Sequence, residues 1–223
     1  MSIYERTQML LGDKKLETLK KSRVIVFGIG GVGGYVCEIL ARTGIGEITI
    51  VDNDVVTKSN INRQIIALNS TLNKPKVEVM KKRLLDINPQ IKVNNYYISF
   101  DKDTQEEFDL TSYDYVVDAI DLINQKLNLI VYAKSLNAKI ISSMGAGNLS
   151  GIPNFIVEDI FKTTYDGLAR KLRVKLKAQN IKDLTVVYTP EQRKKLNPTA
   201  SVAYYPAVCG TVIASYVINE LIK

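Results

Sequence analysis

The chain has 223 residues and a formal net charge of +7, with 46% hydrophobic and 24% charged residues. This is the balance of a globular protein, and no signal peptide opens the chain, so we expect one cytoplasmic domain with no membrane span. It contains no histidine and only two cysteines, Cys37 and Cys209, which excludes histidine bases, histidine metal sites and cysteine zinc clusters. Chemistry must therefore use carboxylates, Lys, Arg, Asn, backbone donors and a bound nucleotide.

The first 21 residues predict an amphipathic cover helix, and residues 24–54 then read as one strand, glycine turn, helix and strand unit. Its turn is G-x-G-x-x-G, with Gly28, Gly30 and Gly33 at the glycine positions and Gly31 between them. In such units, phosphates lie at the N-terminus of the helix that follows the turn. The second strand, 48–51, delivers Asp52 and Asp54, and an acid about 20 residues after the glycines typically binds a ribose hydroxyl.

A polar connection over 55–73 carries Asn60, Arg63 and Gln64, and loops of that length in compact domains are usually functional. Pro75 and Lys76 then open a helix that Asn88 and Pro89 end. Strands are predicted over 91–98 and 113–118, a helix over 122–137 and another strand over 139–143. Asp118 and Asp121 follow a strand end, where open α/β sheets bind ligands.

Beyond residue 147 the pattern changes to short strands at 155–157 and 184–187, a basic helix at 163–179 and a loop at 189–203 that could act as a lid. The long apolar stretch at 202–222 predicts a buried or interface helix. Together these patterns predict an α/β fold with a Rossmann-like, mostly parallel sheet and helices on both faces. We expect one domain over 1–223, with a nucleotide-binding core at 1–147 and a substrate-side extension at 148–223.

The whole positive excess lies between residues 162 and 195, which hold ten basic and three acidic side chains. Apolar residues alternate with the basic ones, so an apolar stripe could anchor the helix while basic tips reach a polyanion. The alternative is an ordinary solvated helix face. The basic tips are Arg170, Lys171, Arg173, Lys175 and Lys177.

Two cations, Arg63 and Lys76, are expected to converge on the nucleotide crevice. A nicotinamide dehydrogenase needs the glycines and one acid but neither cation, whereas a triphosphate undergoing transfer needs both. The two cations alone do not exclude a dehydrogenase or a non-catalytic nucleotide sensor, and both remain alternatives.

Five segments, taken in chain order, resemble the ubiquitin-activating-enzyme-like adenylating superfamily that includes the ThiF and MoeB proteins. These are GIGGVGG, VDNDVVTKSNINRQ, NKPKVEVM, INP and VVDAID. Within this superfamily, three later segments are similar to the bacterial tRNA threonylcarbamoyladenosine dehydratases. These are SSMGAGN, DIFKT with GLARKLR, and VVYTPE.

The resemblance implies roles for residues that match the motifs. Gly31 would accept ATP phosphates, Asp52 would hold the ribose, and Asp121 would bind Mg²⁺. Arg6 would reach the nucleotide of the partner subunit in a homodimer. The remaining phosphate contacts would come from Asn60, Arg63 and Lys76.

The implied activity is ATP-dependent dehydration of threonylcarbamoyladenosine in tRNA, through adenylation of its carboxylate and closure of a ring. The two C-x-x-C pairs of the sulfur-carrier-activating members are missing, and so is the cysteine domain of ubiquitin-activating enzymes. Adenylation of a sulfur-carrier or ubiquitin-like protein is the nearest alternative, and a sulfur-relay protein is a possible further partner. We expect Cys37 to be a packing residue and weigh a functional thiol at Cys209.

Overall fold

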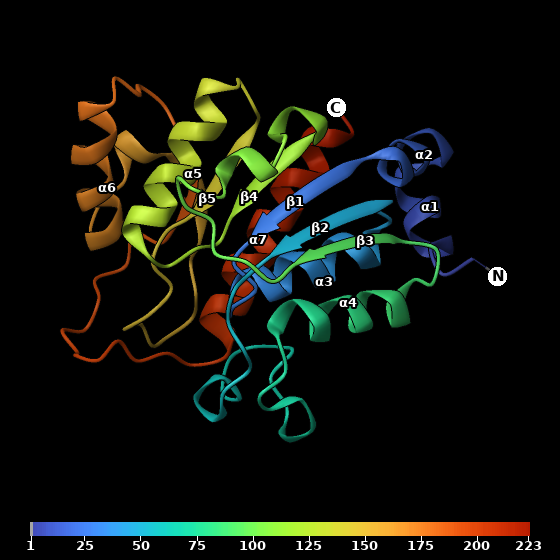
Figure 1. Ribbon diagram of the computed structural model, residues 1–223, viewed down its shortest axis with the longest axis horizontal. Coiled ribbons are helices and arrows are strands. Elements are labelled where there is room, and N and C mark those ends of the chain that lie inside the picture. The colour runs from blue at the N-terminus through green and yellow to red at the C-terminus, as the bar shows by residue number, and fades with distance from the viewer. Residues whose placement is uncertain (1) are drawn as a thin grey trace.

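A computed structural model describes residues 2–223, and its centre is a seven-stranded sheet (Figure 1). The order across the sheet is β3-β2-β1-β4-β5-β7-β6, and all neighbours are parallel except β6, which is antiparallel to β7. The expected mostly parallel α/β sheet is thereby confirmed. The strands are β1 Arg23–Phe27, β2 Glu47–Val51, β3 Lys92–Tyr96, β4 Tyr115–Asp118, β5 Ile140–Ser143, β6 Ile156–Asp159 and β7 Thr185–Tyr188.

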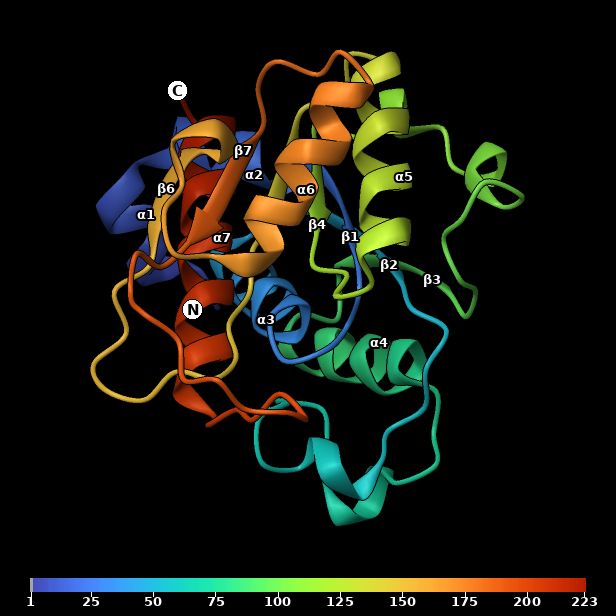
Figure 2. The ribbon, with the colours of Figure 1, turned by 90° about the vertical axis from the view of Figure 1, so that its left-hand side faces the viewer.

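Helices cover both faces of this sheet (Figures 1 and 2). The side chains of β1 show why, since Val24 and Val26 join the core under α2, α3, α4 and α7, while Ile25 and Phe27 join the core under α5 and α6. Successive strand residues point to opposite faces, so an unbroken apolar strand requires cover on both. The helices are α1 Glu5–Leu11, α2 Asp13–Lys21, α3 Gly33–Thr43, α4 Lys76–Ile87, α5 Ile123–Ser135, α6 Gly167–Ala178 and α7 Tyr204–Leu221.

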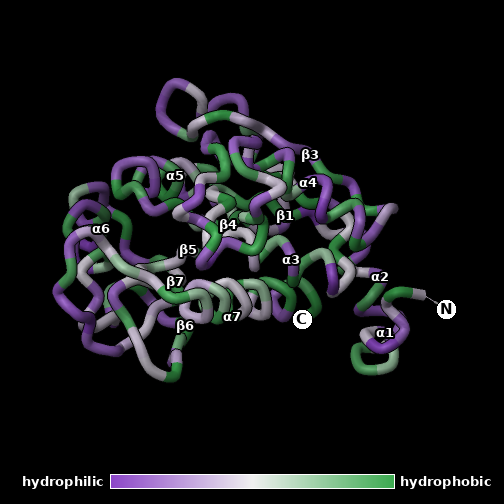
Figure 3. The backbone as a smooth tube through the Cα atoms, turned by 90° about the horizontal axis from the view of Figure 1, so that it is seen from below, coloured by the Kyte–Doolittle hydropathy of each residue, from purple (hydrophilic) through white to green (hydrophobic). Residues whose placement is uncertain are grey.

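The apolar C-terminal helix α7 lies along the sheet and against α3, and Figure 3 shows it as a mainly pale and green tube. Its Tyr205, Cys209 and Ile213 are completely buried. The expectation of a buried helix over this stretch is confirmed. Among residues 2–223, none of the helices combines the length and apolarity that crossing a bilayer requires.

Two predicted helices differ from those observed. The N-terminal helix is broken into α1 and α2 at Gly12, whose φ of 81° no helix can contain. The basic helix begins at Gly167 rather than 163, because Asp166 caps it by accepting the Ala169 N–H at 2.9 Å. Both differences arise from single residues at element boundaries.

Two connections shape the open end of the sheet. Residues 55–75 project from the body as the teal loop at the bottom of Figure 1, closed at its base by a bridge between Val55 and Pro75. The C-terminal connection between β7 and α7 brings Thr199 and Ser201 to the same end of the sheet. Both therefore border the cavity described next.

Candidate nucleotide-binding site

A cavity of about 400 Å³ opens at the carboxyl ends of β1, β2, β4 and β5. It lies where the strand order reverses, because β1 continues the chain to β2 on one side and pairs with β4 on the other. In open α/β sheets, this switch point is where ligands bind.

The glycine turn forms the floor of the cavity. Gly28 adopts φ 87°, and a Cβ there would lie 2.7 Å from the Ala119 carbonyl oxygen. At Gly33 a Cβ would lie only 1.8 Å from the Gly28 carbonyl oxygen, so the turn cannot close with any larger residue. Gly30 and Gly31 line the cavity, and α3 begins at Gly33 with its N-terminus toward it. The turn therefore offers backbone N–H groups and the positive end of a helix dipole to an anion.

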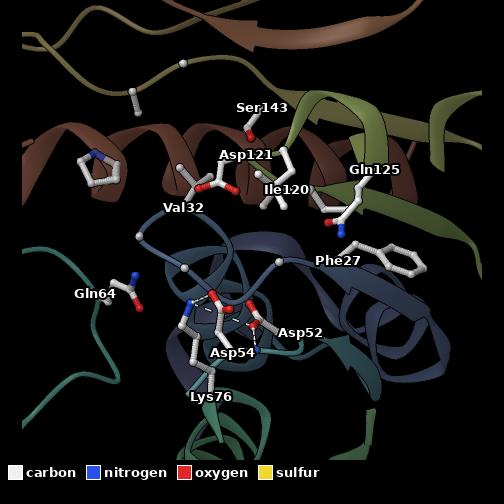
Figure 4. Close-up of a pocket in the computed structure, with 18 of the residues that line it drawn as sticks. Phe27, Val32, Asp52, Asp54, Gln64, Lys76, Ile120, Asp121, Gln125 and Ser143 are labelled. Atoms are coloured by element: carbon white, nitrogen blue, oxygen red, sulfur yellow. Dashed lines mark hydrogen bonds and ion pairs between the residues drawn. The ribbon is translucent and has the colours of Figure 1, made fainter. Parts of the chain in front are cut away.

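One wall is built by Asp52, Asp54 and Lys76, which Figure 4 shows together below the glycine turn. Asp52 accepts the Ile29 N–H at 2.6 Å and the Asp54 N–H at 2.8 Å. The Lys76 Nζ, at the start of α4, lies 2.6 Å from Asp54 Oδ2 and 4.0 Å from Asp52 Oδ1. Burial raises the pKa of Asp52, and the Lys76 ammonium opposes that rise. The Asp54 carboxylate thus holds the lysine side chain, and the Asp54 carbonyl accepts the Lys76 N–H at 3.0 Å.

Asp121 lies across the glycine turn from that wall, close to Ile120 and Ser143 (Figure 4). It is exposed and follows β4 by three residues. Within residues 2–223, no group of three or more metal-ligating side chains is preassembled, and Asp121 is one of three carboxylates that line the cavity, with Asp52 and Asp54 in the wall across the turn. A Mg²⁺ ion usually takes only one or two carboxylates when substrate phosphates supply other ligands, and this donor set fits that pattern.

The projecting loop supplies two more lining residues, Arg63 and Gln64. The Arg63 Nη1 donates to the Ser59 carbonyl at 2.7 Å and to Asn62 Oδ1 at 2.9 Å. Gln64 is buried, and in the part of the chain that the structure describes its Oε1 has no hydrogen-bond partner. A buried oxygen in this position can accept a hydrogen bond from a bound ligand or water. Asn60 is instead buried in the loop, where its Oδ1 accepts the Thr57 N–H at 3.1 Å.

Beneath the cavity lies an ion pair that the sequence analysis missed. Lys126 and Asp118 are both completely buried, with Nζ 2.7 Å from Asp118 Oδ2. The same Nζ donates to Ser142 Oγ and the Ser143 carbonyl, each at 3.0 Å, while Asp118 Oδ1 accepts the Ile120 N–H at 3.1 Å. The signal was a lysine in register with Leu129, Ile130 and Ala133 on the buried face of α5.

The basic helix only partly matches its prediction. Arg170, Lys171, Lys175 and Lys177 are exposed, but Arg173 is turned inward. The Arg173 Nη1 donates to the carbonyls of Ile160 and Thr163, at 3.2 and 3.0 Å, and to Thr163 Oγ1. Val174 is 68% exposed, so it is not part of the anchoring stripe. The prediction that Arg173 is a basic tip that reaches solvent was therefore wrong.

The remaining predicted residues lie elsewhere. Arg6 is exposed on α1, which packs beside α2. Because α2 ends where β1 begins, both helices lie at the opposite end of the strands from the cavity. Cys37 is buried in α3, and burial raises the pKa of Cys209 to about 12. A thiol with that pKa stays protonated at neutral pH and is a poor nucleophile.

Comparison with known proteins identifies this arrangement. The profile of the ThiF family matches residues 4–223. The chain belongs to the ThiF family. It is 37% identical to the tRNA threonylcarbamoyladenosine dehydratase of Bacillus subtilis, over 99% of this chain and 94% of that protein. It is 30% identical to the molybdopterin-synthase adenylyltransferase of Haemophilus influenzae, over 70% of this chain and 64% of that protein.

Solved structures agree with this family membership. The E. coli tRNA N6-threonylcarbamoyladenosine dehydratase in complex with ATP superposes with a TM-score of 0.93 at 33% identity. The match covers 98% of this chain and 93% of that one. That structure holds a nucleotide, and the cavity of this ThiF-family chain has the glycine floor and charged walls that a nucleotide requires.

Proposed function

We propose that the protein is an ATP-dependent tRNA threonylcarbamoyladenosine dehydratase of the cytoplasm. The observation that carries this proposal is one cavity that combines a phosphate-binding glycine turn with a ribose-side acid, Asp52, two cations and an opposite carboxylate. The tRNA dehydratases among its relatives support the substrate, since the match covers nearly the whole of both chains.

The reaction would proceed in two displacements. The threonyl carboxylate of the modified adenosine attacks the α-phosphorus of ATP, and pyrophosphate leaves. A nucleophilic group of the same substituent then attacks the activated carbonyl and gives up its proton to solvent. AMP leaves with one carboxylate oxygen, and a five-membered ring closes. Because the second nucleophile is tethered to the substrate, positioning supplies much of the rate and neither a histidine nor a cysteine relay is needed.

The chain's own residues would act by electrostatics. Asp52, fixed by two backbone N–H groups, faces the ribose hydroxyls. Gly28, Gly30 and Gly31 bring backbone close to the phosphates, and Gly33 begins the helix whose N-terminus points to them. Arg63 and Lys76 offset negative charge on the phosphates. The Gln64 Oε1 accepts a hydrogen bond from a donor group of the ligand. A Mg²⁺ ion held by Asp121 would neutralise phosphate oxygens when bound. Deleting one such contact typically costs about 2.7–4 kcal/mol of transition-state stabilisation.

The direct test incubates the purified protein with ATP, Mg²⁺ and tRNA carrying threonylcarbamoyladenosine, followed by mass spectrometry of the nucleosides. We expect loss of one water from the modified nucleoside, with one AMP released per product. Asp121→Asn should abolish turnover and leave the fold intact. Tight NAD binding without ATP binding would favour the dehydrogenase alternative, and adenylation of a carrier-protein C-terminus would favour the sulfur-carrier alternative.

We propose a homodimer in which Arg6 completes the partner's site. Arg6 lies at the opposite end of the strands from its own cavity, and its helix α1 exposes Met9 by 82% and Leu10 by 84%. Apolar side chains so exposed on a helix are typical of an interface. Mixing Arg6→Ala subunits with Asp121→Asn subunits should restore part of the activity, since one site per mixed dimer keeps both residues. A monomer in light scattering, or no rescue, would refute the dimer.

We also propose that the outer face of α6 contacts tRNA phosphates. Leu168, near the start of this helix, lines the cavity, so the exposed tips further along extend directly from the site. Changing Arg170, Lys171 and Lys177 together to Gln should flatten the slope of log K against log salt by about two to three units. Changing the exposed Lys14, Lys82 and Lys102 to Gln is the control with equal charge loss. Equal slopes in both triple variants would return α6 to an ordinary solvated face.

A further inference from the structure

The segment 193–203, here called the strap, is fastened beside the cavity at its beginning. The Arg193 Nη2 donates to Asp166 Oδ2 at 2.6 Å and to the Gly145 carbonyl at 2.7 Å, and Nη1 donates to the Gly147 carbonyl at 2.9 Å. Gly145 and Gly147 line the cavity, as do Thr199 and Ser201 of the strap. The strap therefore forms part of the cavity wall.

Asn148 fastens the middle of the strap. Its backbone N–H donates to the Ala200 carbonyl and its Oδ1 accepts the Ala200 N–H, both at 2.7 Å. Its Nδ2 donates to the Leu196 carbonyl at 3.1 Å, and its carbonyl accepts the Lys194 N–H at 2.9 Å. These bonds fix the strap to the wall on the β5 side.

A single carboxamide, that of Asn62, joins the far end of the strap to the projecting loop. The Asn62 Nδ2 donates to the Ser201 carbonyl at 3.0 Å, while its Oδ1 accepts from Arg63 Nη1 at 2.9 Å. Asn62 thus joins the Arg63 guanidinium to the strap, and both Arg63 and Ser201 line the cavity. An arginine carries five N–H donors, so Arg63 can bind a phosphate through Nε and Nη2 while Nη1 keeps Asn62.

We infer that Asn62 is a positioning residue that couples nucleotide binding to the strap. A phosphate that fixes the Arg63 guanidinium also fixes the Asn62 carboxamide, and through it the Ser201 backbone. The Ser201 end of the strap, which the Asn148 bonds do not reach, is then held more tightly when ATP is bound, ahead of the tRNA. This inference rests on the proposed function only for the identity of the second substrate.

The arrangement has a chemical use. An acyl adenylate is hydrolysed by water that reaches it, and a wall fixed by the nucleotide restricts that access before the reactive ester forms. It also presents the hydroxyls of Thr199 and Ser201 at a fixed position for the incoming nucleoside. Asn62 is not among the residues that line the cavity, and it acts through Arg63 and the strap.

Amide hydrogen exchange of residues 194–203 tests the coupling, measured with and without saturating AMP-CPP, an ATP analogue cleaved poorly at the α-phosphate. The wild-type strap should exchange at least about fivefold more slowly when the analogue is bound, the lower end of typical coupling between sites. In Asn62→Ala this protection should be lost, although the melting temperature and the affinity for the analogue stay close to those of the wild type. Asn69→Ala, a polar change in the same projecting loop, should retain the protection.

Kinetics supply a second readout. In Asn62→Ala the KM for tRNA should rise several-fold while the KM for ATP changes little. Equal protection of the strap in wild type and Asn62→Ala, or no protection in the wild type, would overturn the inference. If the wild type shows the protection but does not dehydrate tRNA, the coupling stands and the proposed function fails.

Discussion

Two lysine–aspartate pairs lie at the carboxyl ends of β2 and β4, the strands on either side of β1, and they differ in their exposure to solvent. Lys76 faces Asp52 and Asp54 after β2, and Asp54 is 63% exposed. Lys126 faces Asp118 at the end of β4, and both side chains are completely buried. The same two residue types therefore serve an open wall in one place and a sealed floor in the other.

The difference lies in what else satisfies the charges. The Lys126 ammonium donates to three acceptors, Asp118 Oδ2, Ser142 Oγ and the Ser143 carbonyl, which use all three of its N–H groups. Ser142 Oγ in turn donates to Asp118 Oδ2 at 2.6 Å. Among residues 2–223, the Lys76 ammonium contacts only the two carboxylates of its wall, and Lys76 borders the cavity. A buried pair whose hydrogen-bond donors and acceptors are all satisfied has a structural role, whereas a pair with donors left over at a cavity can bind a ligand.

Breaking the sealed pair should have the largest effect. Lys126→Met leaves Asp118 charged, buried and unpaired, which typically costs about 3–5 kcal/mol of unfolding free energy. The double variant Lys126→Met, Asp118→Asn should recover most of that loss, because no buried charge remains. Urea denaturation of the three proteins measures this, and equal stability of the single and double variants would show that the charge is not the cause.

Breaking the open pair should act on catalysis. Lys76→Met removes a cation from the phosphate side of the cavity, and the rate of dehydration should fall about a hundred- to a thousand-fold. Its loss of stability should be smaller than that of Lys126→Met, since Asp54 faces water. Lys82→Met, an exposed change on the same helix, is the control. A rate near that of the wild type would remove Lys76 from the site.

A pH series sharpens the comparison at Asp52. Burial raises the pKa of this carboxyl above its ordinary value, so the folded chain binds its proton more tightly than the unfolded chain. The free energy of unfolding of the wild type, relative to Asp52→Asn, should therefore fall as pH rises from about 4 through the raised pKa. Urea denaturation of both proteins across this range gives the difference, and a rise with pH would contradict the direction.

The smallest effect is expected at Asp54. Its pair with Lys76 is exposed on one side, so Asp54→Asn should change the free energy of unfolding by only about 0.2–1 kcal/mol. Thermal denaturation with Asp118→Asn as the buried counterpart measures the contrast. A loss of about 3 kcal/mol at Asp54 would mean that the two pairs are equivalent after all.

Local patterns in the sequence determined the mostly parallel sheet and the identity of the charged residues that line the cavity. The glycine turn can form in only one way, and the acids and cations that follow strands of a parallel sheet must meet at one edge. The positions of four cavity residues could thus be predicted from the sequence, because each lies at the end or beginning of a predicted strand or helix. These residues are Gly28, Asp52, Lys76 and Asp121.

Only the tertiary structure decided the roles of residues whose partners are distant in the chain. Arg173 alternates with Lys171 and Lys175 in the sequence, and nothing local shows that it alone turns inward onto Thr163. Asn62 meets Ser201 across 139 residues of chain, and Lys126 meets Ser142 from a different element. Periodicity indicates which face of an element is buried, but the hydrogen-bond partner of a buried or bridging polar group depends on how the elements pack.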